Sequence, residues 1–240
     1  MKSNRAIIVQ ARMSSKRLPG KSLMKIGEYP LIYYVLNRLK ITGEQVIVAT
    51  STDSSDDVLV EYLEEQDFKF YRGSLDNVLD RYIATANKFG IEEIIRVTGD
   101  NPFVDIELLQ GSLALFERYT YVDGIYEGGL IKGTGFELVV LNELKSIQNP
   151  SQKYKEHVTY GLREKIILRE NYVQLSVPIY HSSFRNKVIL TCDYQEDFEL
   201  LRILLKYFEY SLQVSIKEIL ILINTNSLLS EINMFRHNNV

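Results

Sequence analysis

Short apolar segments alternate with amphipathic segments through the first 120 residues, and this alternation limits the fold more strongly than any other feature of the chain. The apolar segments, typical of buried strands, are residues 5–10, 45–49, 68–71 and 93–98. The segments with helical spacing are residues 30–39, 56–66, 77–89 and 105–118. Strands and helices in alternation form βαβ crossovers, so the sequence predicts an α/β fold with a doubly wound, mainly parallel sheet.

The second half of the chain is less regular. Five glycines between residues 124 and 135 predict a loop or hairpin over residues 123–135. Helices are expected over residues 142–147, 154–169, 196–207 and, as one or two segments, 215–234, and strands over 172–177 and 187–190. The sequence contains neither a linker nor an internal repeat. We therefore expect one domain over residues 1–240, with a small inserted subdomain in its second half.

Composition argues against a disulfide framework and against a membrane span. Cys192 is the one cysteine, which excludes an intrachain disulfide and a cysteine-rich zinc site and suits a reducing compartment. The longest strongly apolar run near the end, residues 219–223, is far shorter than the roughly 20 residues of a membrane helix. The first nine residues lack a signal-peptide pattern. We expect a soluble, cytoplasmic protein that binds no membrane.

Positive charge is concentrated at the start of the chain. Residues 1–40 contain nine of the 28 Lys and Arg against one acid, Glu28, although the formal net charge of the whole chain is −3. Cations gathered in one region of an acidic chain favour a small, highly charged anion as ligand, rather than a nucleic acid. A solvated basic face is the alternative interpretation of the same pattern.

The loop over residues 10–21 has the composition of a polyphosphate-binding loop. It follows the first predicted strand, and ligands of open α/β sheets bind outside the carboxyl ends of the strands. Small residues that permit a close approach of the backbone are Ala11, Ser14, Ser15 and Gly20. The cations of the loop are Arg12, Lys16, Arg17 and Lys21. Arginine forks, lysine charges and backbone N–H groups together suit phosphate oxygens.

Two common phosphate motifs do not fit this loop. Residues 15–22, SKRLPGKS, resemble a Walker A loop, but Ser15 replaces its first glycine and Pro19 removes a backbone donor. A dinucleotide-binding G-x-G-x-x-G pattern is absent from the loop. The sequence therefore disfavours an ordinary kinase, ATPase or dehydrogenase.

The loop sequence A-R-x-x-S-x-R-L-P-G-K resembles the signature of sugar-acid cytidylyltransferases, which make CMP-activated 3-deoxy-manno-octulosonate and sialic acid. Gln10, where those enzymes usually have proline, points to their spore coat polysaccharide biosynthesis (SpsF-like) relatives. Further similar segments are residues 73–82, 96–102, 156–159 and 190–198. The resemblance implies a Rossmann-like sheet of the nucleotide-diphospho-sugar transferase type. Residues 1–122 would form a nucleotide-binding half, and residues 123–240 an acceptor-facing half with C-terminal helices.

Two carboxylates are candidates for a metal site. Asp100 directly follows the strand at 93–98, with Gly99 allowing the turn, and so lies on the same rim as the basic loop. From the residues alone, Asp100 could be a turn or capping residue, and Asp193 could cap the helix that follows it. The resemblance implies that both bind Mg²⁺, together with phosphate oxygens and waters.

The resemblance also implies Mg²⁺-dependent nucleotidyl transfer, in which an acceptor oxygen attacks the α-phosphorus of a nucleoside triphosphate, most closely CTP, and pyrophosphate leaves. The expected catalytic residues are Arg12, Lys21 and Asp100. The expected nucleotide-binding residues are Ala11, Arg12, Ser14, Ser15, Arg17, Lys21 and Arg81. Glu137 and His157 are expected at the acceptor site, where the ligand would be a small acidic or phosphorylated precursor of a surface polysaccharide or glycan.

Two other functions stay open at this point. One is a sugar-1-phosphate nucleotidyltransferase that uses GTP or another triphosphate. The other is a non-catalytic nucleotide-binding subunit, which we would expect to lack Arg12, Lys21 or Asp100. Glycosyl transfer is disfavoured because no Asp-x-Asp motif ends a central strand. Related synthetases suggest a homodimer.

Overall fold

One mixed sheet organises the computed structural model, which describes residues 4–125, 129–147 and 150–237. Its strands, in spatial order, are β5 (Lys69–Gly73), β4 (Gln45–Ser51), β1 (Arg5–Gln10), β6 (Glu93–Thr98), β8 (Phe136–Val140), β7 (Tyr121–Gly124) and β9 (Tyr172–Gln174). Every neighbouring pair is parallel except the two pairs that β8 makes with β6 and β7. The predicted mainly parallel sheet is confirmed.

Helices cover both faces of the sheet, as the continuous apolar character of β1 requires. Helices α1 (Leu31–Lys40), α2 (Asp57–Glu65) and α4 (Ile106–Ser112) pack on the face that carries Ile7 and Val9. Helices α3 (Val78–Phe89), α5 (Leu141–Lys145) and α7 (Tyr160–Arg163) pack on the face that carries Ala6 and Ile8. All four of these β1 side chains are fully buried.

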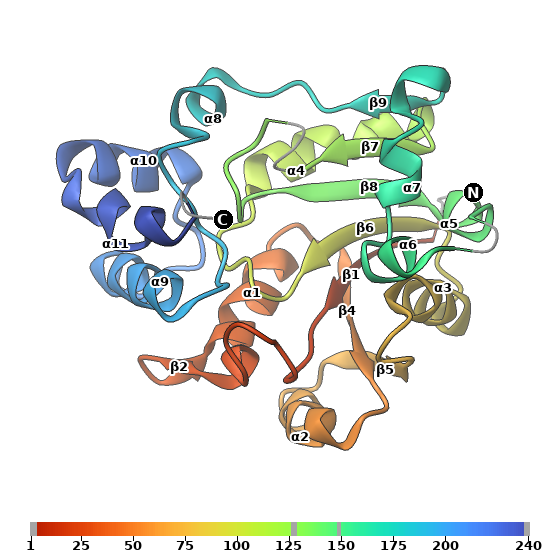
Figure 1. Ribbon diagram of the computed structural model, residues 1–240, viewed down its shortest axis with the longest axis horizontal. Coiled ribbons are helices and arrows are strands. Elements are labelled where there is room, and N and C mark those ends of the chain that lie inside the picture. The colour runs from red at the N-terminus through yellow and green to blue at the C-terminus, as the bar shows by residue number, and fades with distance from the viewer. Residues whose placement is uncertain (1–3, 126–128, 148–149, 238–240) are drawn as a thin grey trace.

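The C-terminal helices lie together to one side of the sheet, not on either of its faces (Figure 1). They are α9 (Gln195–Tyr207), α10 (Ile216–Thr225) and α11 (Leu228–His237), with the short α8 (Ile179–Phe184) nearby. Their apolar side chains form a second core with α1 and with the small hairpin of β2 (Lys25–Ile26) and β3 (Tyr29–Pro30). No helix among the described residues has the length and apolar character that crossing a membrane requires.

The second half of the chain differs from the sequence-based expectation in several places. The helix expected over residues 154–169 is broken into α6 (Gln152–Glu156), α7 and a 3₁₀ turn at Ile166–Leu168, because the backbone leaves helical geometry at His157 (φ −105°, ψ 79°). The strand expected at 187–190 forms only an isolated bridge. Strands β7 and β8 pair antiparallel around the glycine-rich loop, where a loop or hairpin was expected over residues 123–135, but both strands extend beyond that range.

Candidate active site

The loop after β1 is fixed from inside the molecule by Asp56, a residue that the sequence analysis did not single out. Asp56 is fully buried. Its Oδ1 atom accepts a hydrogen bond of 2.6 Å from the backbone N–H of Met13. Its Oδ2 atom accepts hydrogen bonds of 3.1 Å from the hydroxyl of Thr50 and from the backbone N–H of Ser51. The basic loop is therefore tied to the carboxyl end of β4.

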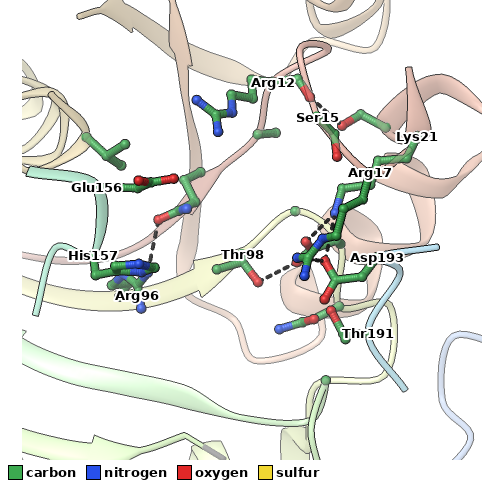
Figure 2. Close-up of a pocket in the computed structure, with 18 of the residues that line it drawn as sticks. Arg12, Ser15, Arg17, Lys21, Arg96, Thr98, Glu156, His157, Thr191 and Asp193 are labelled. Carbon is green, nitrogen blue, oxygen red and sulfur yellow. Dashed lines mark hydrogen bonds and ion pairs between the residues drawn. The ribbon is translucent and has the colours of Figure 1, made fainter. Parts of the chain in front are cut away.

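A cleft of about 630 Å³ opens at the carboxyl ends of β1 and β6. The predicted nucleotide- and metal-binding residues that line it are Ala11, Arg12, Ser15, Arg17, Lys21, Arg81, Asp100 and Asp193. His157 lines it too, whereas Ser14 and Glu137 are not among its lining residues. Figure 2 shows Arg17, Lys21 and Asp193 together on one side of the cleft, with Arg96 and His157 on another. The fold thus brings most of the predicted residues to one place.

Lys21 joins the two candidate metal-binding carboxylates. Its Nζ atom donates to Asp100 Oδ2 and to the carbonyl of Cys192, both at 2.6 Å, and lies 3.6 Å from Asp193 Oδ1. The backbone N–H of Cys192 donates to the carbonyl of Asp100 at 2.9 Å. These contacts place the end of β6 and the segment before α9 side by side, although they are far apart in the sequence.

The same contacts keep this pair ionised at neutral pH. Burial by itself would lower the pKa of Lys21, but the charges of Asp100 and Asp193 outweigh it, so the pKa of Lys21 is raised. Burial would raise the pKa of Asp100, but the charge of Lys21 and hydrogen bonds from Lys21 and Thr98 hold it below its ordinary value.

Asp193 is paired with cations from both halves of the chain. Its Oδ1 atom lies 2.6 Å from Arg17 Nη2, and its Oδ2 atom lies 3.2 Å from Lys132 Nζ. Lys132 belongs to the glycine-rich loop, and no local pattern in the sequence marks it. Gly133 follows with a φ of +98°, and a Cβ atom there would lie 2.2 Å from the backbone of Leu190. Only glycine therefore lets this loop lie against the chain that leads to Asp193.

The donor atoms of this site fit Mg²⁺ when a nucleotide supplies the remaining ligands. Carboxylate oxygens are the ligands that Mg²⁺ prefers, and it is usually held by one or two of them with phosphate oxygens and waters. Asp100 and Asp193 offer such oxygens beside the cations of the basic loop. In the part of the chain that the structure describes, no cluster of three or more His, Cys, Asp and Glu side chains could hold a metal.

Arg96 lies in the cleft and is oriented by residues beneath it. Its Nη2 atom donates to Gln10 Oε1 at 3.1 Å, and its Nη1 atom pairs with Glu137. Glu137 is fully buried and accepts a hydrogen bond of 2.6 Å from Tyr121. The structure places Glu137 below the cleft, where it orients Arg96 and does not line the cleft, and its expected role at the acceptor site stays a prediction. The sequence could have indicated Arg96, because it is a charged residue within the otherwise apolar strand β6.

Replacing Glu137 with glutamine is expected to lower the free energy of unfolding by about 3 kcal/mol at pH 7, because it leaves the largely buried side chain of Arg96 without its closest counter-charge. Burial alone would raise the pKa of Glu137, but Arg96 and Arg163 outweigh it and hold the pKa below 4.5. The stabilisation is therefore present above pH 4.5 and is lost as the pH falls through the folded-state pKa. Urea unfolding of both proteins across this range measures the difference. A gap that widens toward acid pH would contradict this prediction.

Arg81 and His157 contribute to the cleft in different ways. Arg81 is almost fully buried, and its Nη1 atom donates to the carbonyl of Ser74 at 2.6 Å. Burial lowers the pKa of Arg81, and the nearby charge of Arg12 lowers it further. His157 is exposed, at the end of α6. Both residues line the cleft, but their expected roles stay predictions.

Three comparisons relate the chain to known proteins. The family model described as "Cytidylyltransferase" matches residues 6–223. The spore coat polysaccharide biosynthesis protein SpsF of Bacillus subtilis is 34% identical over 230 residues, which are 91% of this chain and 93% of that protein. The solved structure of a cytidylyltransferase from Leptospira borgpetersenii has a TM-score of 0.86 and 26% identity, covering 95% of this chain and 96% of that one.

A more distant structure shares the fold. It is CMP:2-keto-3-deoxy-manno-octonic acid synthetase in complex with CTP, with a TM-score of 0.61 and 18% identity. The alignment covers 86% of this chain and 100% of the synthetase chain. At this level of identity the similarity supports the arrangement of sheet and helices alone.

Proposed function

The chain belongs to the cytidylyltransferase family and is therefore a nucleotidyltransferase, and on this basis we propose the reaction that it catalyses. It transfers CMP from CTP to a small acidic or phosphorylated sugar that serves as a precursor of a surface polysaccharide or glycan. Pyrophosphate is released, Mg²⁺ is required, and the enzyme works in the cytoplasm as a homodimer. The observation that carries this proposal is the meeting of Arg12, Arg17 and Lys21 with Asp100 and Asp193 around one cleft.

The basic loop binds the triphosphate in this proposal. Arg17 and Lys21 contact the phosphate oxygens and stabilise the charge that grows on the departing pyrophosphate. Arg12 lines the same cleft, and no hydrogen bond or ion pair to its guanidinium group is found among the described residues, so it is available to the nucleotide. Asp56 limits movement of the loop backbone, so little backbone reorganisation accompanies the reaction.

The carboxylates hold the metal and orient the α-phosphate. Asp100 and Asp193 would bind Mg²⁺, which when bound supplies positive charge to the phosphate oxygens. Thr98 donates a hydrogen bond of 2.6 Å to Asp100 Oδ1 and so fixes the carboxylate at the end of β6. No residue of the chain needs to form a covalent intermediate, because alignment and fixed charge are sufficient for phosphoryl chemistry of this kind.

The acceptor is expected on the side of the cleft formed by the second half of the chain. Lys132 and His157 line that side, and Arg96 of β6 lies beside His157 (Figure 2). Arg96 and Lys132 are basic side chains, which supports an acceptor that carries a carboxylate or phosphate group. Arg96 is held by Glu137 and Gln10 and therefore presents its charge in one orientation.

Pyrophosphate release tests this function directly. The protein is incubated with Mg²⁺, each of the four nucleoside triphosphates, and a panel of sugar acids, sugar phosphates and neutral sugars. We expect turnover that depends on Mg²⁺ and is strongest with CTP and an anionic acceptor. Turnover restricted to GTP or UTP with a sugar 1-phosphate would favour the alternative nucleotidyltransferase. Light scattering in solution tests the homodimer.

A further inference from the structure

Three cations converge on Asp193, although one carboxylate balances one charge. Arg17 and Lys132 lie 2.6 Å and 3.2 Å from its two oxygens, and Lys21 lies 3.6 Å away. Lys21 is shared with Asp100, at 2.6 Å. Among the described residues, the cleft around these carboxylates is lined by seven Lys and Arg side chains against three acidic ones, so the cleft carries a surplus positive charge.

Lys132 is held in this position by the C-terminal helix. Its Nζ atom lies 3.4 Å from His237 Nδ1, and His237 Nε2 lies 3.0 Å from Asp197 Oδ1. An ionised carboxylate only accepts hydrogen bonds, so the imidazole donates from Nε2 and accepts from Lys132 at Nδ1. Asp197 also accepts 2.8 Å hydrogen bonds from the backbone N–H groups of Asp193 and Tyr194.

Helix α11 therefore fixes both partners of the Lys132–Asp193 pair. It begins at Leu228, after residue 223, where the match to the family model ends. Asn233 of the same helix donates to Asp197 Oδ1 at 2.7 Å and to the carbonyl of Ile189 at 3.0 Å. This arrangement keeps a lysine on a carboxylate that the proposed reaction needs for a metal.

A divalent cation that reaches the protein alone meets two obstacles. The surplus positive charge repels it, and both carboxylates are already bonded to cations. Within the described residues, no further His, Cys, Asp or Glu completes a set of three ligands. A triphosphate removes both obstacles, because it brings several negative charges for the cations and oxygen ligands for the metal.

We propose that Arg17 and Lys132 act as exchangeable counter-ions of Asp193, so that the divalent metal binds only together with the nucleoside triphosphate. His237 is the positioning residue that directs Lys132 to Asp193. When the nucleotide binds, Arg17 and Lys132 turn from Asp193 to phosphate oxygens and free the carboxylate. This inference rests on the proposed function, since it takes Asp100 and Asp193 as the metal ligands.

Manganese binding tests the coupling without any acceptor. Water-proton relaxation enhancement separates Mn²⁺ on the protein from Mn²⁺ on free nucleotide, so binding is compared with and without CTP. We expect CTP to tighten Mn²⁺ binding at least tenfold, which is about 1.4 kcal/mol of coupling. Comparable Mn²⁺ affinity of the wild-type protein in both conditions would overturn the proposal.

Lys132→Met gives two effects of opposite sign. Removal of a surplus charge is expected to tighten Mn²⁺ binding to the nucleotide-free protein about tenfold, because Asp193 loses a competing cation. The same variant binds CTP more weakly in the presence of Mn²⁺, because the nucleotide loses a phosphate ligand. Unchanged or weaker Mn²⁺ binding by the nucleotide-free variant would contradict the exchange.

Two further variants complete the test. Lys206→Met removes the same charge from an exposed position on α9 and is expected to leave both affinities unchanged. His237→Gln keeps Lys132 but loosens its orientation, and it is expected to tighten metal-alone binding by a smaller factor; no change would remove the positioning role. Thermal unfolding of each variant identifies misfolded protein. Pyrophosphate release tests the proposed function separately, so either idea can fail without the other.

Discussion

Asp100→Asn is expected to reduce kcat/KM for nucleotidyl transfer at least a hundredfold, which is about 2.7 kcal/mol of transition-state stabilisation. The side chain keeps its size, but it loses the charge that would hold Mg²⁺ beside the α-phosphate. It also weakens the contact with Lys21, whose Nζ atom lies 2.6 Å from Asp100 Oδ2. Pyrophosphate release at saturating Mg²⁺, with the nucleotide and acceptor that the panel identifies, measures this loss.

Asp67→Asn is a matched control for this change. Asp67 is exposed and has a φ of 52°, a conformation that asparagine adopts well. This variant makes the same chemical change away from the cleft and is expected to keep wild-type kcat/KM. Wild-type turnover by Asp100→Asn would show that Asp100 is not a metal ligand and would contradict the proposed Mg²⁺ site.

Lys21→Met is expected to lose a hundredfold to a thousandfold in kcat/KM, because in the proposed site the lysine both binds the triphosphate and lies between two carboxylates. It is also expected to destabilise the protein by about 2 kcal/mol at pH 7, since Asp100 would keep its charge without its closest cation. Both effects are larger than those of an ordinary surface substitution. Steady-state kinetics and urea unfolding measure them independently.

The pH dependence of this stability loss has a defined sign. The pKa of Asp100 is lowered below 3.8 in the folded protein, so its contribution is present above pH 3.8 and is lost as the pH falls through the folded-state value. The pKa of Lys21 is raised above 10.5, so its contribution is present below pH 10.5 and is lost at higher pH. The difference between the two proteins is therefore largest between these limits.

Lys25→Met separates these effects from a simple change of net charge. Lys25 lies in the same basic region but is exposed on β2. It is expected to keep both the wild-type free energy of unfolding and the wild-type kcat/KM. If Lys21→Met behaves like this control, the lysine belongs neither to the phosphate site nor to the ion-pair network.

The first half of the fold was accessible to sequence reasoning because its elements are long and regular. The strand expected at residues 93–98 is β6, and the helix expected at residues 77–89 is α3 with Asn77 as its N-cap. For β7 and β8 the sequence left a loop and a hairpin open and did not give the extent of the strands, because they flank glycines and have no helical or alternating pattern of their own. The pairing of these strands needs glycine at position 124, because a Cβ atom there would lie 2.6 Å from the carbonyl oxygen of Phe136.

Local sequence determined strand β1, the basic loop over residues 10–21 and the position of Asp100 at the end of β6. Apolar periodicity and turn residues set these features because they depend only on residues close together in the chain. The tertiary structure alone decided which distant side chains meet. Lys21 contacts Cys192 across 171 positions, and Lys132 meets His237 across 105. Glu137 lies beneath the cleft, where it pairs with Arg96 and accepts a hydrogen bond from Tyr121. Such contacts depend on how the C-terminal helices pack beside the sheet, and no local sequence pattern encodes that packing.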